Sequence, residues 1–312
     1  MSLPDALPTL LDQTLEGLKA QESGEQKLLF ALGETHTNPA HRAITAQLLT
    51  ALKESNIHAT LAVEIPADYM RQYLHEAGYP AADVKNISNR IEAADKNGHL
   101  RAHAIIADQM YDSHMGALLR TAMDHGQSII LVDKAVPPGA SPTNVAMDDP
   151  RTRDTAERLG LAGQENLRAL SADGVHLRNE LMVDSCRDAL DAKKEPHVVI
   201  LLAGKNHVAG ATKVDKAGTN YSFEQSLLAL AENKGIAVRA ALLGNSDNLP
   251  SAAPDLTRIE DKIDPEQTPG FKSHKTGMYE WSKESRILLE AAIENAGRGA
   301  QGKYDPTPKP NS

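Results

Sequence analysis

Stretches of consecutive apolar residues alternate along the chain with stretches in which apolar residues recur every three or four positions. The first kind predicts strands buried on both faces, and the second predicts helices that pack against them. Strands are expected at residues 28–32, 59–64, 128–133, 197–203 and 236–243. Helices are expected at 7–18, 39–54, 99–125, 150–170, 174–193 and 223–233. This alternation is typical of a three-layer α/β domain with a mainly parallel sheet of about five strands flanked by helices.

The pattern changes after the second strand and again after the last one. Residues 67–125 begin with a more polar helical stretch, interrupted at Tyr79-Pro80 and Asn97-Gly98, and are expected to form a helical cap. From residue 244 onward Pro, Ser, Asn, Asp and Lys dominate, apart from one amphipathic interval at 282–295. We therefore expect an α/β domain over residues 1–243, with its cap at about 67–125. An extension over 244–312 should hold one helix and a partly disordered C-terminal tail.

Composition and charge narrow the classes of partner. The 312 residues are enough for one large core, and 41% hydrophobic with 24% charged residues is ordinary for a globular protein. A formal net charge of −9 without a basic stripe argues against nucleic acid as a partner. No window reaches the roughly 18 consecutive apolar residues of a membrane helix. The single Cys186 excludes a disulfide within the chain.

The first residues show neither a basic segment nor a long apolar one, so no signal peptide is recognised. A cytoplasmic location is therefore expected, with export by a route that does not use such signals as the alternative.

Two of the predicted strands end in the same tetrapeptide, Gly-x-x-His. The first strand continues into Gly33-Glu34-Thr35-His36, and the fourth continues into Gly204-Lys205-Asn206-His207. Open α/β sheets bind their ligands at the carboxyl ends of the strands. If both strands belong to one parallel sheet, these ends share an edge and the two histidines converge.

Acidic and basic residues are predicted at the same edge. Glu34 and His36 alternate along an extended backbone and should point the same way, so that the carboxylate raises the basicity of the imidazole. Glu64 ends the second strand, where it can contact a water, a metal or His36; the alternative is a partner for the dipole of the next helix. Arg178 lies on an apolar helix face, where it needs a carboxylate such as Glu34 or Glu64, unless it is simply exposed. His41, in the first turn of the helix after the first motif, is a further candidate.

These segments, in this order, resemble a superfamily that groups ChaN-like haem-uptake proteins, Tiki and TraB proteins, and erythromycin esterases. The segments that carry the resemblance are Gly33-Glu34-Thr35-His36 with Asn38-Pro39-Ala40-His41, then Val63-Glu64-Ile65, Arg178-Asn179-Glu180-Leu181-Met182 and Gly204-Lys205-Asn206-His207. The similarity extends over residues 25–243 and is closest to the ChaN-like branch. It implies metal-dependent peptide hydrolysis as in Tiki-like members, lactone opening by a histidine-activated water as in the esterases, or haem binding as in ChaN-like members.

We therefore expect a hydrolase of ester, lactone or peptide bonds that acts on a small-molecule or peptide substrate. His36 or His207 would remove a proton from water, Glu34 and Glu64 would orient the histidines, and Arg178 would stabilise developing negative charge.

The same residues suit a divalent metal, either Zn, Mn or Fe, held by His36, Glu64 and His207, or a site with no metal at all, and the sequence does not choose between them. His41 is the candidate contact for a bound cofactor. The alternatives are a non-catalytic protein that binds haem or another small ligand in the same pocket, and an exported effector or toxin.

Overall fold

The computed structural model describes residues 3–20, 26–36, 38–66, 118–119, 121–122, 124–136, 144–193, 196–214, 219–244 and 257–259. Most of the predicted cap at 67–125 lies outside these residues, as do the predicted helix at 282–295 and the predicted tail. The described residues 118–119, 121–122 and 124 are helical, in agreement with the expected helix at 99–125.

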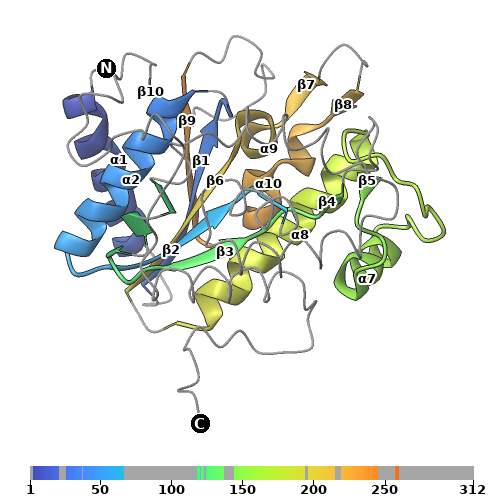
Figure 1. Ribbon diagram of the computed structural model, residues 1–312, viewed down its shortest axis with the longest axis horizontal. Coiled ribbons are helices and arrows are strands. Elements are labelled where there is room, and N and C mark those ends of the chain that lie inside the picture. The colour runs from blue at the N-terminus through green and yellow to red at the C-terminus, as the bar shows by residue number, and fades with distance from the viewer. Residues whose placement is uncertain are drawn as a thin grey trace, which may run out of the picture.

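A parallel sheet runs through the centre of the molecule in the order β10-β9-β1-β6-β2-β3 (Figure 1). Every neighbouring pair in it is parallel. All five predicted strands belong to this sheet, so the α/β fold class is confirmed. A sixth short strand comes from the segment predicted as an extension and pairs with β9. The strands are β1 (Lys27–Glu34), β2 (His58–Val63), β3 (Ser128–Leu131), β6 (His197–Gly204), β9 (Val238–Leu243) and β10 (Thr257–Ile259).

The strand order places β6 between β1 and β2, although β6 follows them by more than a hundred residues in the sequence. In register, Glu34 of β1 lies beside Gly204 of β6, and Val63 of β2 lies beside Leu202. The residues that directly follow these three strands therefore meet at one edge of the sheet. This is the edge at which the two Gly-x-x-His segments were predicted to converge.

Helices cover both faces of the sheet. On one face lie α1 (Leu3–Lys19) and α2 (Pro39–Glu54), and on the other lie α8 (Ala172–Asp191) and α10 (Leu227–Asn233) (Figure 1). The start of α2 agrees with the prediction from Asn38-Pro39, because the Asn38 side chain accepts a hydrogen bond from the backbone N–H of Ala40. Among the helices that the structure describes, none is both long enough and apolar enough to cross a membrane.

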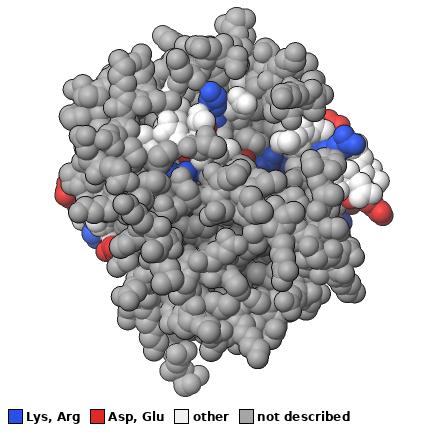
Figure 2. All heavy atoms as spheres, turned by 45° about the horizontal axis from the view of Figure 1, so that its top comes forward, with Lys and Arg blue, Asp and Glu red and all other residues white. Residues whose placement is uncertain are grey.

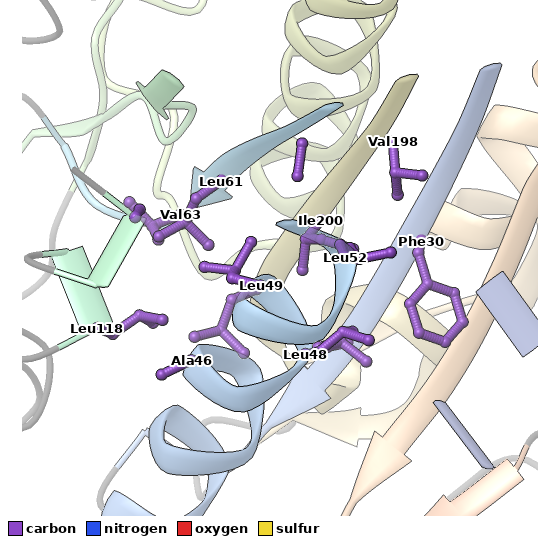
Figure 3. Close-up of a cluster of buried hydrophobic side chains, with 14 of the residues drawn as sticks. Phe30, Ala46, Leu48, Leu49, Leu52, Leu61, Val63, Leu118, Val198 and Ile200 are labelled. Carbon is purple, nitrogen blue, oxygen red and sulfur yellow. The ribbon is translucent and has the colours of Figure 1, made fainter. Parts of the chain in front are cut away.

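Each face of the sheet has its own apolar core, because successive residues of a strand point to opposite faces. Figure 3 shows the core under α2, where strand residues such as Phe30, Leu61 and Ile200 meet Leu49 and Leu52 of the helix. Leu118 packs into the same cluster. The residues of the other face alternate with these along each strand and pack against α8 and α10. Because both faces of the strands are buried, their sequences are unbroken apolar runs.

The structure differs from the predicted elements at three places. The helix expected at 150–170 is the shorter α7 (Pro150–Arg158), because the chain turns at Gly160 and Gly163, whose φ angles are 73° and 84°. Between β3 and α7, where neither a helix nor a strand was predicted, lies a small antiparallel pair, β4 (Ala135–Val136) with β5 (Asn144–Val145). The helix expected at 223–233 is divided at Ser226, which ends η1 (Phe223–Gln225) and caps α10.

Between β6 and η1 the described residues form three elements that the apolar pattern did not predict. They are a helix, α9 (Lys205–Ala209), and an antiparallel pair, β7 (Ala211–Val214) with β8 (Thr219–Tyr221).

His197 lies at the start of β6, at the opposite end of the strand from the second Gly-x-x-His segment. It is buried, and its Nε2 atom lies 3.2 Å from the hydroxyl oxygen of Thr60. Burial and the nearby positive charges of Lys193, His58 and Lys27 lower the pKa of His197 from 6.5 to about 4. Between these two values the unfolded chain binds more protons than the folded protein, so folding stability falls as the pH falls through this window.

We predict that His197→Gln flattens the pH dependence of stability. This histidine should account for a loss on the order of 3 kcal/mol in the free energy of unfolding as the pH falls from 6.5 to 4. Urea unfolding at a series of pH values measures the slope in wild type and variant. The same substitution at the exposed His58 is the comparison. It removes only one of the charges that lower the pKa of His197 and leaves the burial of His197 in place, so it should change the slope far less. Equal slopes in His197→Gln and wild type would contradict the prediction.

Candidate functional site

The two Gly-x-x-His segments depend on each other's glycine. A Cβ atom on Gly33 would lie 2.6 Å from a methyl carbon of Leu242 and 3.0 Å from the Cα atom of Lys205, the first residue of α9. A Cβ atom on Gly204 would lie 3.0 Å from Nε2 of His36. Each glycine therefore leaves the space that the other segment occupies. A larger residue at either position would push the two histidine segments apart.

The first motif forms a Glu–His pair at the end of β1, in which Glu34 is buried and His36 is half-buried. Oε1 of Glu34 lies 2.9 Å from Nδ1 of His36, as the alternation of their side chains predicted. Arg42, fully buried in α2, lies with its Nε 3.6 Å from Oε2 of Glu34, and it donates a hydrogen bond to the carbonyl oxygen of His36. Arg42 thus ties the turn after β1 to the helix that follows it.

Neighbouring charges shift the pKa values of Glu34 and His36 in the directions that favour an ion pair between them. Burial by itself would raise the pKa of Glu34, but Arg42 and the hydrogen bond to His36 outweigh it, and the pKa is lowered. Burial by itself would lower the pKa of His36, but Glu34 and the charge of Glu64 outweigh it, and the pKa is raised above 6.5. His36 is therefore a stronger base than a histidine in water.

Glu64 lies at the centre of the site and is held by three donors. Its Oε1 accepts from Nη2 of Arg178 at 2.9 Å and lies 3.1 Å from Nε2 of His207. Its Oε2 accepts from the backbone N–H of Gly204 at 2.7 Å and lies 3.8 Å from Nε2 of His36. Burial would raise the pKa of Glu64, but His207, His36 and Arg178 hold it well below 4.5. Glu64 is thus an anion placed between the two histidines.

Arg178 is bound on all sides by oxygen acceptors. Its Nε and Nη2 donate to the two carboxylate oxygens of Asp133 at 2.7 and 2.9 Å, Nη2 also donates to Glu64, and Nη1 donates to the carbonyl oxygen of Ala169 at 3.3 Å. The predicted carboxylate partner Glu64 is therefore present, together with Asp133, which was not predicted. A guanidinium held in this way fixes the position of Glu64.

His207 is held from both sides of its ring. Nδ1 lies 2.6 Å from Oδ1 of Asn179, and Nε2 faces Glu64. The Asn179 side chain in turn donates to the backbone oxygen of Gln225 at 2.7 Å. The ring therefore connects the helix α8 and the turn η1 with the centre of the site.

The structure brings together all five residues that the sequence analysis assigned to the catalytic site: Glu34, His36, Glu64, Arg178 and His207. Three participants were not assigned to it, although each carried a signal. Arg42 lies in the helix directly after the first motif, Asp133 follows the third strand as Glu64 follows the second, and Asn179 is the neighbour of Arg178.

His41 is 1% exposed, and its Nδ1 accepts a hydrogen bond from the backbone N–H of Thr35. This contact supports the turn after β1. The predicted role of His41 in binding a cofactor stays a prediction.

The predicted metal ligands are arranged as hydrogen-bonding partners. Within the described part of the chain, no group of three or more His, Cys, Asp or Glu side chains has an arrangement that holds a metal ion. Glu64, the central member of the predicted set with His36 and His207, already receives Arg178 on one oxygen and the Gly204 N–H on the other. As they are placed, the three residues do not fit a metal ion. Binding of a divalent metal or of haem stays a prediction.

The chain was compared with protein-family models, characterised proteins and solved structures, and none of them matches it. The resemblance to the ChaN, Tiki and erythromycin-esterase superfamily therefore stays a prediction.

Figure 2 views the molecule from the upper side of Figure 1, where α9 lies. In the middle of the band of described residues on this face, Lys and Arg atoms reach the surface.

Among the network residues, the His36 side chain is the most exposed, at 24%, compared with 11% for His207 and 7% for Glu64. His36 is therefore the group of the network most open to a solvent molecule.

We predict that Glu64→Gln lowers the free energy of unfolding at pH 7 by about 3–5 kcal/mol, because it removes the charge that the buried guanidinium of Arg178 requires. The stabilisation by Glu64 is present above pH 4.5 and is lost as the pH falls toward the lowered pKa. The two proteins should therefore converge in stability in acid.

The measurement is urea unfolding of wild type and Glu64→Gln over a range of pH. Glu157→Gln, at an exposed glutamate of α7, is the matched control and should stay within about 0.5 kcal/mol of wild type. A loss in Glu64→Gln no larger than that of the control would show that the network does not hold Glu64 as described.

Proposed function

We propose that the protein is a hydrolase in which His36 removes a proton from a water molecule that attacks an ester, lactone or peptide carbonyl. The observation that carries this proposal is the Glu34–His36 pair. A buried carboxylate lies on Nδ1, so that the ring keeps its Nδ1–H tautomer and leaves Nε2 as the proton acceptor. The hydrogen bond to Glu34 and the charge of Glu64 raise the pKa of His36 against the effect of burial, so its ring accepts a proton more readily than a histidine in water.

The surroundings of Nε2 support the same role. Oε2 of Glu64 lies 3.8 Å from Nε2, so one water molecule can donate its two hydrogens to these two acceptors. Gly204 leaves this place open, since a Cβ atom there would lie 3.0 Å from Nε2 and 3.4 Å from Oε2. When His36 takes up a proton, the anionic Glu64 stabilises the imidazolium that forms.

The reaction then has two proton transfers through His36. The water oxygen bonds to the carbonyl carbon while Nε2 of His36 takes a water proton, and a tetrahedral intermediate forms. The bond between the carbonyl carbon and the leaving oxygen or nitrogen breaks, and His36 returns its proton to that atom. Arg178 holds Glu64 in position during these steps, since its donors are bound to Asp133, Glu64 and Ala169.

The substrate stays as broadly defined as in the sequence analysis: a small molecule or a peptide with an ester, lactone or amide bond. Non-catalytic binding of haem or another small ligand, action as an exported effector, and the cytoplasmic location all stay predictions.

We predict that His36→Ala lowers kcat/KM of the hydrolase by about 10²- to 10⁴-fold, the usual contribution of a general base. The measurement is a screen of esters, lactones and peptides with the wild-type protein, followed by kinetics of the variants on every substrate that is cleaved. His58→Ala, at an exposed histidine at the start of β2, is the matched control and should keep wild-type activity.

Gly204→Ala serves as a second variant, because its methyl group would fill the place proposed for the water. It should also lose activity. Activity that persists in both His36→Ala and His207→Ala would reject the proposed site. Metal analysis of the purified protein and a haem titration followed by its Soret band test the cofactor predictions separately.

A further inference from the structure

We propose that Asn179 is a positioning residue that keeps a proton on Nδ1 of His207, so that His207 supports Glu64 and does not compete with His36 for the proton of water. The catalytic part of this inference rests on the proposed function. The assignment of the proton rests on geometry alone, and it can be tested on a protein without a known substrate.

The orientation of the Asn179 amide is determined by its second partner. The Asn179 side chain is buried, and one end of the amide lies 2.7 Å from the backbone carbonyl oxygen of Gln225. A carbonyl oxygen can only accept a hydrogen bond, so this end must be the NH2 group. The amide oxygen then faces His207, 2.6 Å from Nδ1. Because an amide oxygen also only accepts, Nδ1 of His207 must carry a hydrogen.

The other ring nitrogen faces a second acceptor. Nε2 of His207 lies 3.1 Å from Oε1 of Glu64, an oxygen that also accepts from Arg178. While Glu64 is ionised, a lone pair on Nε2 would point at a negative oxygen, whereas an N–H forms a charge-assisted hydrogen bond. The ring of His207 is therefore a donor on both sides and has no lone pair for a water molecule.

The two histidines of the paired motifs thus differ in what their Nδ1 atoms contact. For His36 the partner is the carboxylate of Glu34, which increases the basicity of the ring and leaves Nε2 at 3.8 Å from Glu64. For His207 the partner is a neutral amide, and Nε2 is in direct contact with Glu64. The first arrangement suits a base and the second suits a fixed donor.

The turn that holds Asn179 is itself well defined. Gln225 ends η1, where its side chain accepts from the backbone N–H of Ser222 in a capping box. The next residue, Ser226, is fully buried and caps α10. The acceptor for the Asn179 NH2 group is therefore set by the backbone of this turn rather than by a mobile side chain.

The decisive measurement is the ¹⁵N chemical shift of the histidine ring nitrogens at pH 7, read from two-bond ¹H–¹⁵N correlation spectra. The signals of His207 are assigned by their absence in His207→Gln. In the wild-type protein Nδ1 of His207 should resonate as a protonated nitrogen. In Asn179→Ala the proton on Nδ1 loses its acceptor, and Nδ1 should move to the range of an unprotonated nitrogen while Nε2 keeps its hydrogen toward Glu64.

Two further variants separate this effect from a general disturbance. Asn179→Asp keeps an acceptor beside Nδ1 and should keep the protonated signal. Asn206→Ala removes a neighbouring, half-buried amide of α9 and should leave the signals of His207 unchanged. An unprotonated Nδ1 in the wild-type protein would overturn the proposal whether or not Asn179→Ala folds. Equal Nδ1 signals in a folded Asn179→Ala and wild type would overturn it as well.

Kinetics give the second, separate readout on any substrate that the screen identifies. Asn179→Ala should lower kcat about 10- to 100-fold with little change in KM, and Asn179→Asp should recover part of the loss. If no substrate is cleaved, the proposed hydrolase fails, but the ring spectra still decide the role of Asn179. If activity is found and Asn179→Ala leaves kcat unchanged, the inference fails while the hydrolase stands.

Discussion

The buried carboxylate of Glu64 is the interaction on which the site depends. A buried anion is tolerated only when donors replace the water that it has lost, and Glu64 receives them from three separate elements. Gly204 at the end of β6, Arg178 on α8 and His207 on α9 all point at its two oxygens. Because these contacts come from different parts of the chain, the same carboxylate that places His36 and His207 also joins the sheet to the helices of one face.

The rest of the network is arranged so that no buried charge is left alone. Glu34 faces Arg42 and His36, and Asp133 forms two parallel hydrogen bonds with Arg178. His36 lies next to both Glu34 and Glu64, so a proton that it takes up during a reaction is stabilised by two neighbouring carboxylates.

The strand order brings the residues of this network together. Inserting β6 between β1 and β2 brings Gly204 beside Glu34 in register, and the missing side chains of Gly33 and Gly204 allow the two histidine segments to approach each other. The three-dimensional arrangement therefore explains both specified residues of the motif Gly-x-x-His. The glycine makes room for the neighbouring segment, and the histidine three residues later reaches the common centre.

The sequence by itself determined the features that depend on local physics. Buried runs such as Leu28-Leu29-Phe30-Ala31-Leu32 identified all the central strands, Asn38-Pro39 identified the start of α2, and the polar residues after the strands identified the candidate site. Gly160 shows the limit of such patterns, since the helix α7 ends before it although apolar residues continue beyond. The short β10 had no apolar run to mark it.

Only the tertiary structure decided which groups meet. The contacts that decide the site join residues far apart in the chain. β6 lies between β1 and β2, and Arg178 is shared by Glu64 and Asp133. Asn179 faces His207, while the backbone carbonyl of Gln225 sets the orientation of the Asn179 amide. Local periodicity reports which face of an element is buried. It carries no information on the partner across the interface, because that partner is set by the packing of the whole sheet and its helices.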